Sequence, residues 1–209
     1  MRKYLIALYF IGVSALSQSV DMKRIALTFD DGPKIKVTEQ ILDVLKENEA
    51  KGTFFIVGVN GKRYPEILKK IYNDGHQIAN HSYNHPNFKK ISIEDVKKEL
   101  EDTNKIIQKT TGESVKYFRP PYGSLAKSQK EEVRKNLGMI SVMWNICPQD
   151  WEKKFDSEYI AKFLVENARD KGVILLHDYE KTGEALKIAI PILKRNGYEF
   201  VTIDELYKR

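Results

Sequence analysis

Short apolar runs alternate with segments in which apolar residues recur every three or four positions, from about residue 22 to the end of the chain. The runs are typical of buried strands, and the three-to-four spacing is typical of amphipathic helices. Strands are predicted at residues 25–29, 53–57, 77–79, 115–118, 139–146, 173–176 and 200–202. Helices are predicted at 37–49, 64–74, 92–110, 128–137, 157–169 and 182–196, with a closing helical turn at 203–207.

Boundary residues support two of these helices. Ser92 and Ser157 stand where an N-cap is expected, and Gly112 follows the end of the helix at 92–110. About seven strand–helix units with nearly continuous apolar strands indicate a parallel sheet covered by helices. We therefore predict an α/β protein with a single barrel-like domain over residues 22–209. A doubly wound open sheet is the alternative, because periodicity does not separate the two.

The N-terminal segment has a different pattern. Arg2 and Lys3 precede an uncharged run over residues 4–16, and small residues stand near Ser17. This pattern predicts a secretory signal peptide at residues 1–17, and the run is too short for a comfortable membrane span. A first core strand and an uncleaved anchor are the alternatives. We expect an extracytoplasmic protein, secreted, periplasmic or associated with the cell envelope, without a stable membrane span after cleavage.

Charge and cysteine content narrow the function further. The 209-residue chain has a formal charge of +6, but its basic residues are scattered among acidic ones. The chain lacks the basic–aromatic platform that single-stranded nucleic acid requires, so we expect no nucleic-acid partner. The single cysteine, Cys147, cannot form an intramolecular disulfide, so the core must stabilise the fold. We expect a monomer.

Most of the candidate chemistry follows the predicted strands. The polar residues at these strand ends are Asp30, Asp31, His81, His85, Arg119, Asp150, His177 and Asp178. The carboxyl ends of parallel strands share one face of an α/β fold, and that face carries the functional site. We therefore expect these side chains to meet.

Two histidines four positions apart, His81 and His85, can reach a single metal ion. One carboxylate from the adjacent pair Asp30 and Asp31 completes three ligands and leaves positions open for water, as in a catalytic site. Zinc is the expected ion, and Co²⁺, Ni²⁺, Mn²⁺ and Fe(II) are alternatives. The rigid loop at 119–123, with two prolines and Gly123, can aim the Arg119 guanidinium at a fixed point.

In this order, the segments at 28–33, 81–85, 119–123, 150–151 and 175–177 resemble the five motifs of the polysaccharide deacetylase family. This family is also called the NodB-homology domain or carbohydrate esterase family four. The resemblance covers essentially the whole chain after the predicted signal peptide. It implies a distorted (β/α) barrel of about seven parallel strands. It also implies a metal-dependent hydrolase that removes N-acetyl groups from an amino-sugar polymer such as peptidoglycan or chitin.

The resemblance also implies a role for each motif residue. Asp31, His81 and His85 would hold the metal. Asp30 would be the general base, oriented by Arg119, and His177 would be the general acid. The substrate pocket would include the Tyr122 backbone N–H as an oxyanion donor, with Trp151, Leu175 and Asp150.

One position departs from the family pattern. Cys147 stands four residues before Trp151, where we expect an aspartate that supports the acid histidine. A thiol is a weak acceptor, so His177 would lack its partner unless Asp150 or Asp178 substitutes. This departure leaves a catalytically weak carbohydrate-binding domain as an alternative function. The donor set itself leaves a second alternative, a non-haem Fe(II) oxygenase that uses two histidines and one carboxylate.

Overall fold

The computed structural model describes residues 22–208, so the predicted signal peptide at 1–17 lies outside the described residues. Within this part of the chain, seven parallel strands form one sheet in the order β5-β4-β3-β2-β1-β6, and β7 also pairs with β1. The strands are β1 (Lys23–Asp30), β2 (Gly52–Ile56), β3 (Gln77–Asn80), β4 (Tyr117–Phe118), β5 (Ile140–Ser141), β6 (Gly172–His177) and β7 (Tyr198–Phe200).

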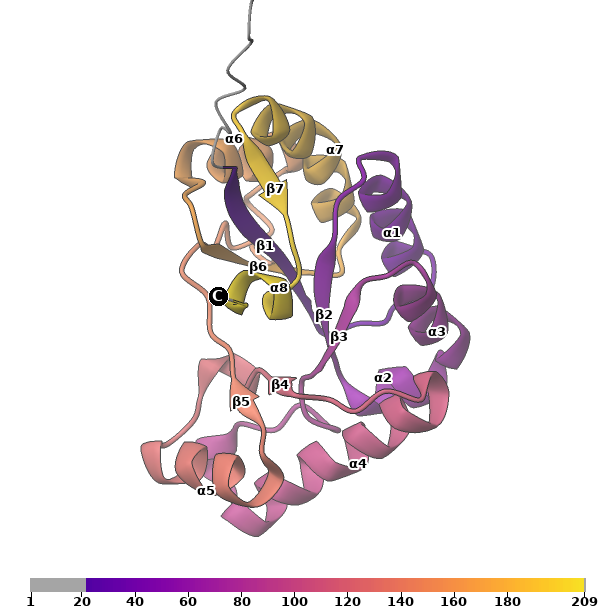
Figure 1. Cartoon of the computed structure of the whole chain (residues 1–209), viewed down its shortest axis with the longest axis vertical. Helices are drawn as coiled ribbons and strands as arrows, with labels where there is room; N and C mark the ends of the chain where they lie inside the picture. The colour runs from indigo at the N-terminus through magenta and orange to yellow at the C-terminus, as the bar shows by residue number, and fades with distance from the viewer. Residues whose placement is uncertain (1–21, 209) are drawn as a thin grey trace, which may run out of the picture.

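Most of the helices cover the outer side of this sheet, whereas the short α8 (Ile203–Tyr207) packs against its inner side (Figure 1). They are α1 (Val37–Glu47), α2 (Gly58–Arg63), α3 (Pro65–Asn73), α4 (Ile93–Thr111), α5 (Lys127–Leu137), α6 (Ser157–Asn167), α7 (Glu180–Arg195) and α8 (Ile203–Tyr207). Two 3₁₀ turns, Phe88–Lys90 and Pro121–Gly123, lie in the loops after β3 and β4. None of the helices between residues 22 and 208 is both long and apolar enough to cross a membrane.

The sheet curls into part of a barrel and does not close. Strands β5 and β6 lie at the two ends of the strand order, and the segment that follows β5 reaches β6 through an isolated bridge between Ile146 and Ile174. The predicted single α/β domain with a distorted barrel of about seven strands is confirmed. The alternative of a doubly wound open sheet is wrong, because the strands curl around a common interior (Figure 1).

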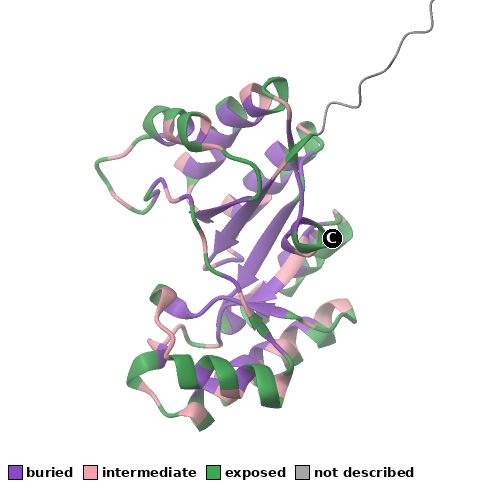
Figure 2. Ribbon diagram, turned by 60° about the vertical axis from the view of Figure 1, so that its left-hand side comes forward, coloured by how far each residue is buried: buried purple, intermediate pink, exposed green. Residues whose placement is uncertain are grey.

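The core surrounds β1. Its last six residues are all buried, because neighbouring strands cover both of its edges and packed side chains cover both of its faces. Phe29 stacks on Phe54 of β2, with ring centroids 4.7 Å apart. Figure 2 shows the strands as a buried centre and the outer faces of the helices as exposed. Burial on both faces explains why the strands appear in the sequence as continuous apolar runs.

The structure refines the predicted helix starts. The Ser92 hydroxyl accepts a hydrogen bond from the Asp95 backbone N–H, and Gly112 ends α4 with a left-handed φ of 81°, as predicted. The predicted cap at Ser157 is wrong. Asp156 is the N-cap of α6, and its carboxylate accepts a hydrogen bond from the Tyr159 backbone N–H at 2.8 Å.

The predicted strand at 139–146 is mostly irregular, and only Ile140–Ser141 remains as β5. The reason lies in the carbonyl groups that follow. The carbonyl oxygen of Val142 accepts a hydrogen bond from Arg119 Nε at 3.1 Å, and that of Met143 lies 3.5 Å from Arg119 Nη2. This segment therefore turns its backbone acceptors toward a buried guanidinium instead of a neighbouring strand.

Candidate active site

The strand pairing brings the two proposed acid–base residues side by side. Asp30 is the last residue of β1 and His177 is the last residue of β6, and the two are register partners. Neighbouring strands lie about 4.8 Å apart, so the two side chains begin from adjacent backbone positions. They face a cavity of about 450 Å³, which Asp31, His81 and His85 also line.

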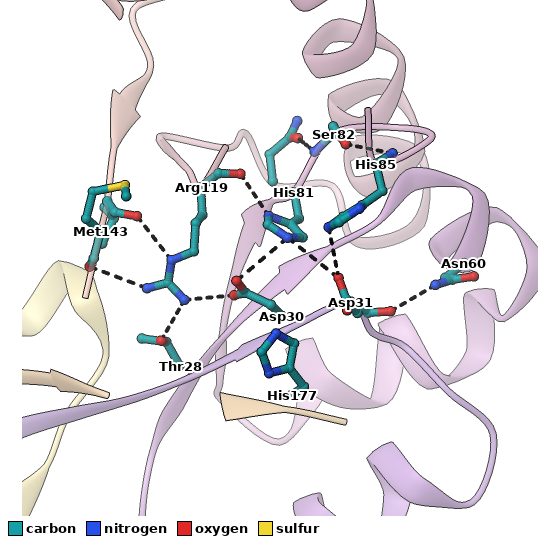
Figure 3. Close-up of polar contacts among 12 residues, drawn as sticks. Thr28, Asp30, Asp31, Asn60, His81, Ser82, His85, Arg119, Met143 and His177 are labelled. Atoms are coloured by element: carbon teal, nitrogen blue, oxygen red, sulfur yellow. Dashed lines mark hydrogen bonds and ion pairs between the residues drawn. The ribbon is translucent and has the colours of Figure 1, made fainter. Parts of the chain in front are cut away.

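Asp30 is buried and paired with a buried cation. Arg119 Nη1 donates to Asp30 Oδ1 at 2.7 Å and to the Thr28 hydroxyl at 2.8 Å, and Arg119 itself is 0% exposed (Figure 3). The guanidinium also lies 4.1 Å from the ring centroid of Phe55. These contacts fix the Arg119 side chain and place its positive charge beside the Asp30 carboxylate.

His81, His85 and Asp31 converge on one point. Asp31 Oδ1 lies 3.3 Å from His85 Nε2 and 3.6 Å from His81 Nε2. One potential ligand atom from each of the three residues lies within 4.8 Å of the other two. Figure 3 shows both imidazoles turned toward the Asp31 carboxylate.

The hydrogen bond of His81 Nδ1 determines which tautomer the imidazole adopts. His81 Nδ1 lies 2.8 Å from the Arg119 carbonyl oxygen, which can only accept, so Nδ1 carries the proton and Nε2 is left as an electron-pair donor. Burial lowers the pKa of His81, although the charges of Asp30 and Asp31 act in the opposite direction. A neutral imidazole with a free Nε2 is the form that binds a metal ion.

These residues fit a divalent cation. Asp31 Oδ1 is buried and has no hydrogen-bond partner among residues 22–208, which is unusual for a carboxylate oxygen. Two imidazole nitrogens face the same oxygen. A bound cation would satisfy Asp31 Oδ1 and both Nε2 atoms together, and two histidines with one carboxylate form a ligand set that several divalent metals accept.

The carboxylate partner of His177 is Asp150. This corrects two predictions: that the partner would stand at position 147, and that Asp150 would line the substrate pocket. Asp150 Oδ1 lies 2.8 Å from His177 Nδ1, and Asp150 Oδ2 accepts hydrogen bonds from the His177 backbone N–H and the Thr182 hydroxyl. Asp150 is completely buried, so it lies behind His177 and not on the substrate-facing wall where it was expected. His177 therefore has a carboxylate partner, although position 147 is a cysteine.

Of the two candidate partners, Asp150 contacts His177 and Asp178 does not. Asp178 faces away from His177, and its carboxylate accepts a hydrogen bond from the Thr38 hydroxyl. Burial lowers the pKa of His177, but the hydrogen bond and charge of Asp150 outweigh it, so the net shift is upward. Burial raises the pKa of the half-buried Cys147 thiol, which therefore stays protonated and neutral.

Aromatic and apolar side chains form the remaining walls of the cavity. Leu175 and Trp151 line it as expected, and the Trp151 ring lies edge-on to His177 with a centroid separation of 5.2 Å. Tyr122 is 70% exposed, and its ring packs against that of His85 with a centroid separation of 4.7 Å. The left-handed φ of 59° at Tyr122 sets the direction of its backbone N–H.

Two lining residues were missed from the sequence. Trp144 lies in the segment that was predicted as a continuous strand, and Tyr179 follows His177 by two positions. Aromatic residues near the strand ends were the only signal that could have identified them. With these rings, the cavity combines one apolar side with one side of carboxylates and imidazoles.

The fold and the site together define a parallel α/β protein with a donor set suited to a metal ion, flanked by a buried carboxylate and a supported histidine. A family model described as polysaccharide deacetylase matches residues 17–142, more than half of the chain. The chain belongs to the polysaccharide deacetylase family. This membership favours hydrolysis over the oxygenase alternative.

Similar proteins are found among both sequences and solved structures. The chain is 39% identical over 186 residues to the peptidoglycan-N-acetylglucosamine deacetylase PgdA of Listeria monocytogenes, covering 88% of this chain and 39% of that protein. The structure of peptidoglycan deacetylase PdaC from Bacillus subtilis matches with a TM-score of 0.83 and 36% identity, covering 89% of this chain and 90% of the other.

A second similar structure is that of BA3943 from Bacillus anthracis, described as a CE4 family pseudoenzyme. Its TM-score is 0.84 at 29% identity, with coverage of 90% of this chain and 66% of the other. This fold therefore occurs in proteins with and without activity, so the activity of this chain has to be argued from its own side chains.

Proposed function

We propose that this protein is a metal-dependent N-deacetylase of an amino-sugar polymer, with peptidoglycan as the favoured substrate. One observation carries the proposal: two register partners, Asp30 and His177, flank the donor set, and each has its own buried counter-ion. Asp30 is paired with Arg119, and His177 with Asp150. A non-catalytic sugar-binding domain would not need two separately supported titratable groups at one cavity.

Asp31, His81 and His85 would hold the metal ion, most simply Zn²⁺. When bound, the ion supplies a Lewis acid that makes water more acidic, toward a pKa of ~7, and polarises an acyl oxygen. Asp30 lies beside this donor set, with Oδ2 3.7 Å from His81 Nε2. Asp30 accepts the proton of the attacking water, and Arg119 holds the carboxylate in place while it does so.

His177 provides the acid on the other side of the cavity. An amine is a poor leaving group unless its nitrogen is protonated. Asp150 raises the pKa of His177, so more of the imidazole carries a proton at neutral pH, and its Nε2–H is available for transfer. Asp150 also fixes the ring through Nδ1, so Nε2 faces the cavity.

The remaining walls fit an N-acetyl group. Leu175 and Trp151 present an apolar surface that would accept the acetyl methyl group. The Tyr122 backbone N–H would donate to the oxyanion that forms on the acyl oxygen. The relatives named above are peptidoglycan deacetylases, and this supports an N-acetylated sugar of the cell wall as the substrate.

The proposed substrate agrees with the predicted location. Peptidoglycan lies outside the cytoplasmic membrane, and the signal peptide predicted at residues 1–17 would direct the chain there. We therefore propose an extracytoplasmic enzyme whose catalytic domain is residues 22–209.

The test is acetate release from peptidoglycan and from chitin oligomers, with and without a chelator. We expect the wild-type chain to release acetate, chelator to abolish release, and zinc to restore it. Asp30→Asn should reduce the rate by about 10²-fold or more. Release that is insensitive to chelator, or a full rate for Asp30→Asn, would refute the proposed mechanism. If the chain binds metal but releases acetate from neither polymer, the alternative of a catalytically weak carbohydrate-binding domain would be favoured.

A further inference from the structure

The loop that carries both histidine ligands has an unusual backbone. Ser82 and His85 both adopt left-handed conformations, with φ of 66° and 60°. Residues with a Cβ rarely occupy this region, so the surrounding structure must hold the loop in place. The hydrogen bonds of this loop therefore determine where the His85 imidazole lies.

Some of these bonds are internal to the loop and the strand before it. The Ser82 backbone N–H donates to Asn80 Oδ1 at 2.8 Å, and the His85 backbone N–H donates to Ser82 Oγ at 2.9 Å (Figure 3). The N-terminus of α2 contributes two more, because Gly58 and Val59 donate to the carbonyls of the loop. Tyr83 and Asn84, at the tip between the two strained residues, need a different acceptor.

That acceptor is Glu99, on α4. Its Oε2 accepts the backbone N–H groups of Tyr83 at 2.8 Å and Asn84 at 2.6 Å. Its Oε1 accepts the side-chain amide of Asn84 at 2.9 Å. A single carboxylate thus holds both backbone donors at the tip.

The Glu99 carboxylate has no competing partner. Among residues 22–208 no lysine, arginine or histidine forms an ion pair with it, and the preceding Lys98 pairs with Asp102 instead. Charge-assisted hydrogen bonds from backbone N–H groups to a carboxylate are about twice as strong as neutral ones. The main polar contacts of Glu99 are therefore with the ligand loop.

We propose that Glu99 is a positioning residue for the metal site: its carboxylate holds the 82–85 turn and thereby sets the place of the His85 imidazole beside Asp31. This inference rests on the proposed metal site. Glu99 contacts neither the cavity nor the ligand atoms, so it acts through the backbone. Partners of this kind, one step removed from the ligands, typically contribute 10–100-fold to metal affinity.

The test measures the zinc dissociation constant of the full chain by competition with a chromophoric chelator. We expect Glu99→Ala to weaken zinc binding by about 10–100-fold. Glu99→Gln keeps the size of the side chain and one acceptor oxygen, so its loss should be smaller. Glu101→Gln is the matched control: Glu101 is exposed on the same helix and should leave zinc affinity unchanged.

A second measurement separates positioning from a general loss of folding. At saturating zinc, kcat of Glu99→Gln should return to within about twofold of wild type, because Glu99 does not touch the substrate. Zinc affinity of folded Glu99→Ala or Glu99→Gln equal to wild type, or an equal loss in Glu101→Gln, would overturn the inference. A wild-type chain that binds zinc but releases no acetate would refute the proposed function and leave this inference intact. A wild-type chain that binds no zinc would overturn both.

Discussion

The buried pair of Asp30 and Arg119 gives the sharpest test of the site as a physical unit. Replacing Arg119 by Met removes a guanidinium that is 0% exposed and donates to Asp30, Thr28 and Val142. The substitution leaves the Asp30 carboxylate buried without its counter-charge. Removing one partner of a buried ion pair costs about 3–5 kcal/mol, most of it from the charge left behind. We therefore expect Arg119→Met to lower the free energy of unfolding by about 4 kcal/mol.

The double variant isolates the cause. If the uncompensated charge is responsible, Asp30→Asn in the Arg119→Met background should recover about 2 kcal/mol, because the remaining side chain is then neutral. The assay is reversible urea unfolding at pH 7, followed by circular dichroism with chelator present, so that bound metal does not contribute. Arg134→Met is the control, since Arg134 is exposed on α5 and should stay within about 0.5 kcal/mol of wild type. A loss below about 1 kcal/mol for Arg119→Met, or no recovery in the double variant, would refute the reasoning.

Three further predictions follow from the other titratable groups. Burial, assisted by the charge of Lys51, lowers the pKa of His76 from 6.5 to about 4. As the pH falls, the unfolded chain therefore binds this proton before the folded chain does. The free energy of unfolding should drop by about 3 kcal/mol between pH 6.5 and pH 4. His76→Gln should flatten this loss in urea midpoints measured across that range. Asp150→Asn should lower the pKa of His177, move the basic limb of the kcat–pH profile to lower pH, and reduce kcat by about 10²-fold or more. Cys147→Ser should leave that profile unchanged, and a shift would show that the thiol affects the acid.

The sequence was sufficient to predict much of the fold and most of the site. Strands buried on both faces leave continuous apolar runs, and the carboxyl ends of parallel strands share one edge. The placement of Asp30, His81 and His177 around one cavity therefore followed from order along the chain alone. The histidine spacing also predicted a donor set of both imidazoles and one carboxylate of the Asp30–Asp31 pair, and the family resemblance implied that this carboxylate is Asp31.

Other features depend on loop conformation, which periodicity does not encode. The family pattern placed the partner of His177 at position 147, but the turn around Gln149, with a φ of 57°, brings Asp150 behind the imidazole. The strand predicted at 139–146 is mostly absent because its carbonyl groups accept hydrogen bonds from Arg119, a residue more than 20 positions away. Both features arise from contacts between distant segments, and a local sequence pattern does not predict such contacts.

The pairing of β1 with β6 has a consequence for the order of folding. Asp30 on β1 meets His177 on β6 across 147 positions of sequence, and Lys23 meets Tyr198 on β7 across 175. Strand β1 therefore keeps one open edge until the last quarter of the chain joins it, and long-range parallel pairing of this kind is slow. The acid and the base come together only at that closing step. Recovery of activity during refolding should thus lag behind the recovery of helix signal, and the enzyme's own turnover would report the final docking of its sheet.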